Sequence, residues 1–249
     1  MAWAYALKDV ASRLPLSCEV AVFTAVYYDR PMRLAKAPNA GCSVAFVNEV
    51  GKHRLPGWMQ VAYLDAPGDL PRSAHVVKIP VWMDRPVVYL DLKLTVSPLP
   101  RQMMPPGCYD VAVTMHPSFA SRSVNEELKR TSSHMQSRKM GAGVHLDLKV
   151  QAERMRRTDF DMDATRVMPD TYYVAWNHTE RAMRFAALWY DEVSRFSMRE
   201  QTNFNFVANV TQARVRYLPH RHPFGAVPPR ARARVTGPAS GPRQSRTCP

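Results

Sequence analysis

The stretch TYYVAWNHTERAMRFAALWYDEVSRF, residues 171–196, decides the fold class of this 249-residue chain. Its first six residues are mostly aromatic or β-branched and predict a buried strand over 171–176. The following part predicts an amphipathic helix over 180–196, because apolar residues recur there every three or four positions, at Phe185, Leu188, Trp189, Val193 and Phe196. A strand followed closely by a helix with one apolar face predicts an α/β fold, in which helices cover a sheet.

Short apolar segments upstream predict further strands, at 19–27, 43–48, 59–65, 86–91 and 109–115, with an alternating run at 92–96. Helices are expected in a short segment broken near Pro80, in the polar and basic stretch 122–157, and from Ser197 to about Ala208. Strands come early and helices late, without a regular strand–helix–strand repeat. We therefore predict one α/β domain over residues 15–212, with a mixed central sheet flanked by helices.

The composition excludes several classes of protein. Hydrophobic residues make up 46% of the chain and charged residues 22%, which is enough to build a buried core. No apolar run approaches the roughly 20 residues that a membrane span needs. The beginning, MAWAYALKDVASRLPL, lacks the basic segment of a secretory signal. We therefore expect neither a membrane span nor a secretory leader.

The four cysteines are far apart in the sequence, at Cys18, Cys42, Cys108 and Cys248. No CxxC pair is present for zinc or redox chemistry. In a chain without a signal, scattered cysteines indicate reduced thiols, and this predicts a cytoplasmic location. Cys18 and Cys42 lie beside apolar strands and are predicted to pack as small hydrophobic residues.

The formal net charge of +13 is concentrated at the C-terminal end. No Asp or Glu follows Glu200, and residues 211–249 hold eight arginines and seven prolines. We assign residues 213–249 to a flexible tail. Such a segment buries too little apolar surface to offset its conformational entropy, so the chain is predicted to be disordered beyond about Leu218. The tail would bind polyanions non-specifically or simply keep the protein soluble.

Glycine-rich and catalytic signature motifs are missing from the chain. There is no GxGxxG, no GxxxxGK[ST], no GxSxG and no HExxH. No glycine-rich loop can therefore cradle a phosphate. An anionic ligand would have to be held by cationic side chains or by a metal ion.

Two polar residues follow predicted strands at positions where ligands often bind. Asp91 ends a strongly apolar strand, and open α/β sheets bind ligands beyond the carboxyl ends of their strands. It would bind a divalent cation or cap the next turn. His116 precedes Pro117, which favours an extended backbone at the histidine. It would face the same edge as Asp91 or be a buried structural histidine.

Two further candidates lie near the late helices. His178 follows the strand 171–176 and would be a ligand of a metal ion or phosphate, or only a residue at the start of the next helix. Glu200 stands three residues after Ser197, the spacing of a capping box. The alternative is that Glu200 places a carboxylate near the sheet edge, beside Arg199 and Gln201.

The segment NHTERAMRFAALWYDEVSRFSMREQTNFNFV, residues 177–207, carries a run that is shared with a known family: a histidine, an apolar Leu-Trp helix, an acidic pair and an Arg-acid-Gln triplet. Shorter matches in the same order are Phe23-Thr24-Ala25, Phe46-Val47-Asn48, Arg72, Lys78-Ile79-Pro80, Tyr89-Leu90-Asp91, and His116-Pro117 with Asn125-Glu126-Glu127. Over about residues 20–210 the chain resembles a glycosyltransferase-like family that includes plant mucilage-biosynthesis and turgor-regulation proteins and bacterial relatives.

The resemblance implies a GT-A-like fold that transfers a sugar from a nucleotide-sugar donor to a hydroxyl of a carbohydrate or glycan acceptor in polysaccharide biosynthesis. It implies catalytic roles for Asp91, Glu200 and His116, with Glu200 as general base. The implied donor- and substrate-binding residues are Thr24, Asn48, Arg72, Lys78, Glu126, Arg199 and Gln201. A divalent cation, Mn²⁺ or Mg²⁺, would be bound by Asp91 and His178.

The chain departs from the family pattern at four places, and at one of them Tyr27-Tyr28 replaces glycines that follow the first strand. Leu92 replaces a glycine after Asp91, Asn48 replaces an aspartate, and Glu200 replaces the aspartate of Arg-Asp-Gln. These changes leave open a catalytically inactive relative that binds nucleotide sugars or glycans. The basic tail leaves open a polyanion-binding protein. A hydrolase is a further possibility, although no nucleophile motif supports it.

Overall fold

The computed structural model describes residues 9–34, 36–38, 41–63, 74–91, 104–105, 107–116, 121–137, 142–196 and 200–219. Seven strands form one sheet in the order β3-β2-β1-β4-β8-β5-β9. Their bounds are β1 (Ala21–Val26), β2 (Ser43–Val47), β3 (Met59–Ala62), β4 (Val87–Leu90), β5 (Val111–Met115), β8 (Pro169–Trp176) and β9 (Val215–Leu218). The predicted α/β class and mixed sheet are thus confirmed.

Strand direction gives the sheet two different edges. β8 runs antiparallel to both of its neighbours, β4 and β5, and all other neighbouring strands are parallel. Six strands therefore end where β8 begins, and we call this the carboxyl edge. The opposite side, where six strands begin and β8 ends, is the amino edge.

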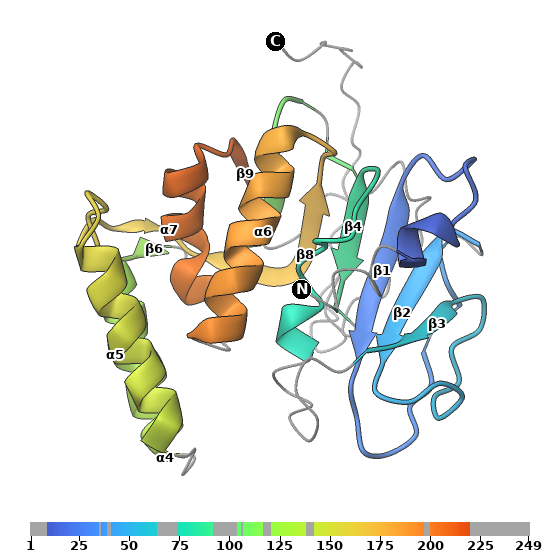
Figure 1. The fold of residues 1–249 in the computed structure, drawn as a ribbon, viewed down its shortest axis with the longest axis horizontal. Helices are drawn as coiled ribbons and strands as arrows, with labels where there is room; N and C mark the ends of the chain where they lie inside the picture. Colours follow the sequence, from blue (N-terminus) through green and yellow to red (C-terminus); the bar gives the residue numbers. More distant parts are fainter. Residues whose placement is uncertain are drawn as a thin grey trace, which may run out of the picture.

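The helices are α4 (Val124–Ser137), α5 (Ala142–Arg156), α6 (Glu180–Arg195) and α7 (Glu200–Thr211), and a small second sheet pairs β6 (Ser121–Arg122) with β7 (Arg166–Val167). Figure 1 shows α6 and α7 in front of the part of the sheet that contains β8, with α4 and α5 beyond them at the left. The helices expected in 122–157, 180–196 and after Ser197 are confirmed. The expected run at 92–96 lies outside the described residues.

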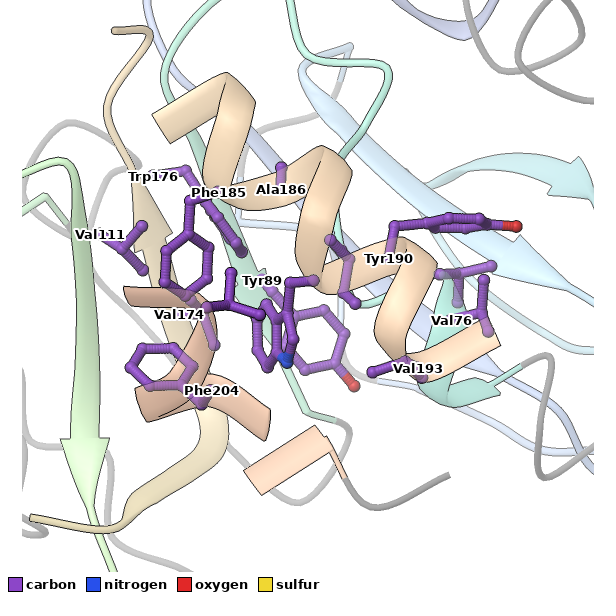
Figure 2. Close-up of a cluster of buried hydrophobic side chains, with 14 of the residues drawn as sticks. Val76, Tyr89, Val111, Val174, Trp176, Phe185, Ala186, Tyr190, Val193 and Phe204 are labelled. Atoms are coloured by element: carbon purple, nitrogen blue, oxygen red, sulfur yellow. The ribbon is translucent and has the colours of Figure 1, made fainter. Parts of the chain in front are cut away.

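A buried aromatic cluster fixes α6 and α7 on the sheet. The ring centroids of Trp176 on β8 and Phe185 on α6 are 5.6 Å apart, and those of Phe185 and Phe204 on α7 are 5.1 Å apart. Figure 2 shows these side chains together with Tyr89 of β4 and Tyr190 of α6. The apolar stripe predicted on 180–196 therefore faces the sheet, and the start of α7 has a defined position relative to β4 and β8.

The domain is longer at both ends than predicted. Val10 and Leu14 are buried in the main core, before the expected start at residue 15. Residues 215–218, predicted to belong to the flexible tail, form β9, which pairs with β5 in parallel. Arg216 within this segment and Arg214 before it make the short alternating strand look like part of the basic tail. The remaining tail, residues 220–249, lies outside the described residues.

The prediction of reduced thiols is wrong for the N-terminal pair. Cys18 and Cys42 form a disulfide, with Cα atoms 5.7 Å apart. The bridge joins the residues that precede β1 and β2, two neighbouring parallel strands, at the amino edge. Cys108 is disulfide-bonded as well. The basis for predicting a cytoplasmic location is thereby removed, because such bridges persist in oxidising compartments.

Within the part of the chain that the structure describes, every helix is too short or too polar to cross a bilayer. This agrees with the short apolar runs of the sequence.

Candidate functional site

The candidate site lies at the carboxyl edge, where the strand order reverses. From β1 the chain moves outward to β2 and β3, and then returns to place β4 on the other side of β1. Open α/β sheets bind ligands beyond the strand ends at such a switch point. Thr24 links β1 to the end of β4, because its hydroxyl donates a hydrogen bond to the carbonyl of Leu90 at 2.6 Å.

A buried carboxylate, that of Glu200, is the centre of the site. Glu200 is the first residue of α7 and only 1% exposed. Its Oε1 accepts hydrogen bonds from Lys78 Nζ at 2.8 Å and from the Thr171 hydroxyl at 2.6 Å. Its Oε2 lies 2.5 Å from His75 Nδ1. Both oxygens therefore have partners, and these partners come from segments far apart in the sequence.

The core positions this carboxylate. Trp189 of α6 is fully buried, and its indole N–H faces the Glu200 carbonyl at 3.0 Å and Asn203 Oδ1 at 2.7 Å. The Leu-Trp and Arg-acid-Gln segments are thus physically connected: the tryptophan of the first fixes the helix start of the second. Lys78 Nζ also lies 5.7 Å from the centre of the Tyr89 ring, and this contact helps to hold the ammonium group beside Glu200.

Charge compensation keeps both members of the buried pair ionised. Burial alone raises the pKa of the Glu200 carboxyl, but the charges and hydrogen bonds of His75 and Lys78 outweigh it and hold the pKa well below its usual range. Burial also lowers the pKa of Lys78, but the attraction of Glu200 prevails and the net shift is upward. Lys78 therefore remains a cation in a site from which water is nearly excluded.

Two more carboxylates share this edge. Asp91 follows β4, and its N–H donates to the carbonyl of Tyr172 on β8 at 2.8 Å. Asp170, 4% exposed, lies two residues before that tyrosine. Burial raises the pKa of Asp170 to about 7, while Lys78 opposes the shift and the charges of Asp91 and Glu200 reinforce it. Among the described residues, the site thus brings three carboxyl groups close to Lys78.

We call this group the carboxyl-edge cluster: His75, Lys78, Asp91, Asp170, Thr171 and Glu200. The prediction that Glu200 is the general base does not fit its geometry. A carboxylate with three donors and a lowered pKa is a poor proton acceptor at neutral pH. Its contacts instead suit a residue that positions its partners, His75 and Lys78.

Three other predicted residues lie along the same edge, outside this cluster. The main-chain N–H of His116, directly after β5, donates to the Met168 carbonyl at 2.9 Å. Asn48, after β2, lies two strands from β4 and accepts from His53 Nε2 at 3.0 Å. The side-chain oxygen of Gln201 is buried and has no hydrogen-bond partner within the described residues. Strand β1 lies between Asn48, at the end of β2, and the part of the edge near β4 where the charges around Glu200 gather.

Glu126 has a local structural role that the prediction did not assign. Its carboxylate accepts from the Ser123 N–H at 2.7 Å, and its own N–H donates to the Ser123 hydroxyl at 3.1 Å. This is a reciprocal capping box at the start of α4. The neighbouring Glu127 is buried and pairs with Arg122. The capping contacts account for Glu126 without a substrate.

His178 lies at the wrong edge to share a metal ion with Asp91. Asp91 pairs with Tyr172 near the start of β8. His178 lies six residues after Tyr172, toward the amino edge, and an extended chain of that length spans about 20 Å. The prediction of a joint Asp91–His178 site is therefore wrong. The sequence shows that a strand precedes His178, but it does not show that this strand runs antiparallel to its neighbours.

Arg72 and Arg199 lie outside the described residues, so the predictions for them remain predictions. Sequence reasoning missed three members of the cluster: His75, Asp170 and Thr171. His75 precedes Lys78 by three residues, a helical spacing that was available as a signal. Asp170 and Thr171 lie at the start of a strand, where only the antiparallel direction of β8 brings them beside Asp91.

The described residues contain no group of three or more His, Cys, Asp or Glu side chains arranged to hold a metal ion. Asp91 and Asp170 nevertheless provide two oxygen donors on adjacent strands. Mg²⁺ is commonly held by one or two carboxylates together with substrate phosphates. The donor set therefore fits an ion that arrives with a diphosphate, and not a metal caged by the protein alone.

A separate groove of about 390 Å³ lies between α4 and α5, with Lys129, Lys149 and Arg156 among its lining residues. It contains no member of the carboxyl-edge cluster. The candidate site is therefore identified by converging charges and by strand topology, and not by cavity volume.

Comparison with protein-family models places these residues in context. Residues 76–219, more than half of the chain, match the family model described as TOD1/MUCI70, glycosyltransferase-like domain. The matched region includes Lys78, Asp91, Asp170 and Glu200 and extends to the end of β9. No curated protein matches the chain. The chain belongs to the TOD1/MUCI70 glycosyltransferase-like domain family.

Proposed function

We propose that the protein transfers a glycosyl group from a nucleotide-sugar donor to an acceptor hydroxyl at the carboxyl-edge cluster. One observation carries this proposal: three carboxylates, a buried lysine and a partly exposed histidine converge beside the β1–β4 switch point. The resemblance implies a GT-A-like binding mode, with the nucleotide beyond the ends of β1 and β2 and the reacting sugar near β4.

The departing nucleoside diphosphate gains negative charge, and the site must stabilise it. Lys78 is a buried cation within the cluster, and Glu200 fixes its position. A charge pair about 4 Å apart is worth on the order of 4 kcal/mol at an effective dielectric constant near 20. A divalent cation, when bound, would neutralise the diphosphate further, and Asp91 with Asp170 would hold it.

A donor screen tests the proposal. We expect uridine, guanosine or cytidine diphosphate sugars to raise the melting temperature, more so with manganese, and to yield nucleoside diphosphate when an acceptor is present. Asp91→Asn should reduce turnover by at least about 100-fold while the fold survives. The matched control is Asp84→Asn at the amino edge, where Asp84 is half-exposed and pairs with Arg85.

Undiminished turnover by Asp91→Asn would contradict the assignment of Asp91. Absence of both binding and turnover with every donor would overturn the proposed function itself.

A second candidate function, binding without catalysis, is supported by one observation. Asn48 stands where the family pattern has an aspartate, and its amide oxygen is already occupied by His53. Calorimetry separates the two functions: measurable affinity for a nucleotide sugar with no turnover under any metal or acceptor condition supports the binding protein.

A further inference from the structure

His75 differs from the other partners of Glu200 in its exposure. About 30% of its side chain is accessible, against 11% for Lys78 and 1% for Glu200. It lies in a single helical turn before β4, and the family match begins one residue after it, at Val76. A basic side chain thus connects the buried carboxylate to the surface of the site.

We propose that His75 is the proton acceptor of the reaction and that Glu200 is its positioning residue. This inference rests on the proposed function and adds to it the group that activates the acceptor hydroxyl. It replaces the general-base role that the resemblance implied for Glu200.

The division of contacts around Glu200 supports the assignment. Lys78 and Thr171 both use Oε1, and this leaves Oε2 to His75 Nδ1. An imidazole whose Nδ1–H donates to a carboxylate carries its free electron pair on Nε2, on the far side of the ring. Glu200 Oε2, 2.5 Å from Nδ1, is the carboxylate oxygen that lies against this ring. This is the arrangement by which a carboxylate orients a histidine base.

Charged groups from several elements belong to the cluster around the ring. Glu200 faces it from α7, while Asp170 of β8 and Asp91 after β4 add negative charge to the same cluster. Lys78, three residues further along the chain, is the opposing cation, and it is paired with Glu200. Among the described residues, the cluster around the ring thus contains three carboxyl groups and one lysine.

The proposed step balances as follows. The acceptor hydroxyl gives its proton to His75 Nε2 while its oxygen forms a bond to the anomeric carbon of the donor. The bond between that carbon and the diphosphate oxygen breaks, and its electron pair leaves with the diphosphate. The proton on Nε2 passes to solvent after the products leave, which the partial exposure of the ring permits.

The test is the pH profile of turnover in the full chain. His75→Asn can keep a hydrogen bond to Glu200 but cannot accept a proton, so kcat should fall by about 10²- to 10⁴-fold. Donor affinity measured by calorimetry should stay within about threefold of the wild type. The acidic limb of the profile should disappear. His178→Asn, a histidine change at the amino edge, is the matched control and should leave the profile unchanged.

Two further measurements separate a catalytic role from a structural one. Added imidazole should restore part of the activity of His75→Ala, which a purely structural histidine would not allow. Glu200→Gln should lower kcat several-fold, because a neutral amide holds the His75 ring in place less firmly than the carboxylate does.

The possible outcomes are distinguishable. Unchanged kcat and an unchanged profile in His75→Asn, with an active wild type, overturn this inference and leave the proposed function standing. Loss of donor binding in His75→Asn together with failure of imidazole rescue also overturns it. A wild type that binds and turns over no donor overturns the proposed function, and this inference with it.

Discussion

The two edges of the sheet each contain a buried carboxylate, and their surroundings differ. At the amino edge Asp110, fully buried, accepts from the Thr179 hydroxyl and the Arg214 N–H, each at 2.8 Å, and from the Arg214 guanidinium at 3.3 Å. Burial alone raises the pKa of Asp110, and the hydrogen bonds from Arg214 and Thr179 more than reverse the shift. At the carboxyl edge Glu200 is equally buried and has its pKa lowered as well.

The difference lies in the partners. Those of Asp110 are two arginines that stay charged, Arg214 and, at 4.0 Å, Arg181, together with a main-chain N–H and the hydroxyl that caps α6. Together they tie β5 to β9 and to α6, and a structural role accounts for all of them. Those of Glu200 include a lysine and a histidine, with Asp91 and Asp170 close by. Stability of the fold does not require this surplus of titratable groups, so the carboxyl edge is where we place the chemistry.

The largest expected effect on stability comes from removing the cation at each edge. Lys78→Met leaves Glu200 charged, buried and close to Asp170, and should lower the free energy of unfolding by about 3–5 kcal/mol. Arg214→Met should cost less, about 1–3 kcal/mol. Arg214 is about one-third exposed, and Asp110 keeps its main-chain and Thr179 bonds. Urea unfolding of the two variants measures the contrast.

A double variant checks the cause of this loss. Replacing both members of the pair, as Lys78→Met with Glu200→Met, removes the uncompensated charge and should recover most of the stability. If Lys78→Met alone proved as stable as the wild type, Glu200 would not be an anion in the folded protein.

The second effect concerns Asp170, where removing the carboxylate should raise the free energy of unfolding instead of lowering it. Its pKa is raised to about 7 in the folded state, against about 3.9 when unfolded. Between these values the unfolded chain releases a proton that the folded chain retains, so stability falls as pH rises through this window and does not recover above it. Asp170→Asn should therefore be more stable than the wild type above pH 7, by up to about 4 kcal/mol, and equal to it below pH 4.

Melting temperatures from pH 3.5 to 8.5 measure this difference. Thr114→Val is a useful control, because it removes a hydroxyl that donates to the Asp170 carbonyl at 2.5 Å but leaves the carboxylate in place. Equal pH slopes in Asp170→Asn and the wild type would mean that Asp170 is not buried as described.

The third effect tests the amino edge alone. The Cys18–Cys42 disulfide closes a 24-residue separation, and removing it with paired serines should cost about 3 kcal/mol. Donor affinity should not change, because the bridge lies at the opposite edge from the cluster. Alkylation with mass spectrometry checks the bond directly. Free thiols at both positions in freshly isolated protein would contradict it.

The sequence predicts the strands well and the site only in part. Asp91 is recognisable because it ends a strongly apolar strand, and both Asp91 and Lys78 lie within segments shared with the family. Glu200 is recognisable as a helix start, but spacing alone cannot show that its carboxylate is buried against Lys78. Periodicity reports the local element and says nothing of its partners in space.

What the sequence hides depends on strand direction and pairing. The run TYYVAW predicts a strand equally well in either direction, so Asp170 was missed and His178 was assigned to the wrong edge. β9 is hard to recognise because Arg216 and the preceding Arg214 make it look like part of the tail. The disulfide has no local signature, since the parallel pairing of β1 and β2 is what brings residues 18 and 42 together.

The smallest expected effect on stability compares the two edges most directly, because each buried carboxylate accepts a hydrogen bond from one threonine hydroxyl. Thr171 donates to Glu200 Oε1 at 2.6 Å and Thr179 to Asp110 Oδ1 at 2.8 Å. Valine has nearly the same shape, so each Thr→Val change should cost about 1 kcal/mol. Thr179→Val should cost slightly more, since that hydroxyl also accepts from the Ala182 N–H as the cap of α6.

The two variants should separate in activity and not in stability. Thr171→Val weakens the hold on Glu200, and through it on His75 and Lys78, so turnover and its pH profile should change several-fold. Thr179→Val should leave both unchanged at a temperature where the protein remains folded. Equal effects of the two changes on turnover would mean that the carboxyl edge is no more functional than the amino edge, because the same hydroxyl loss, at nearly the same cost in stability, would then have the same consequence.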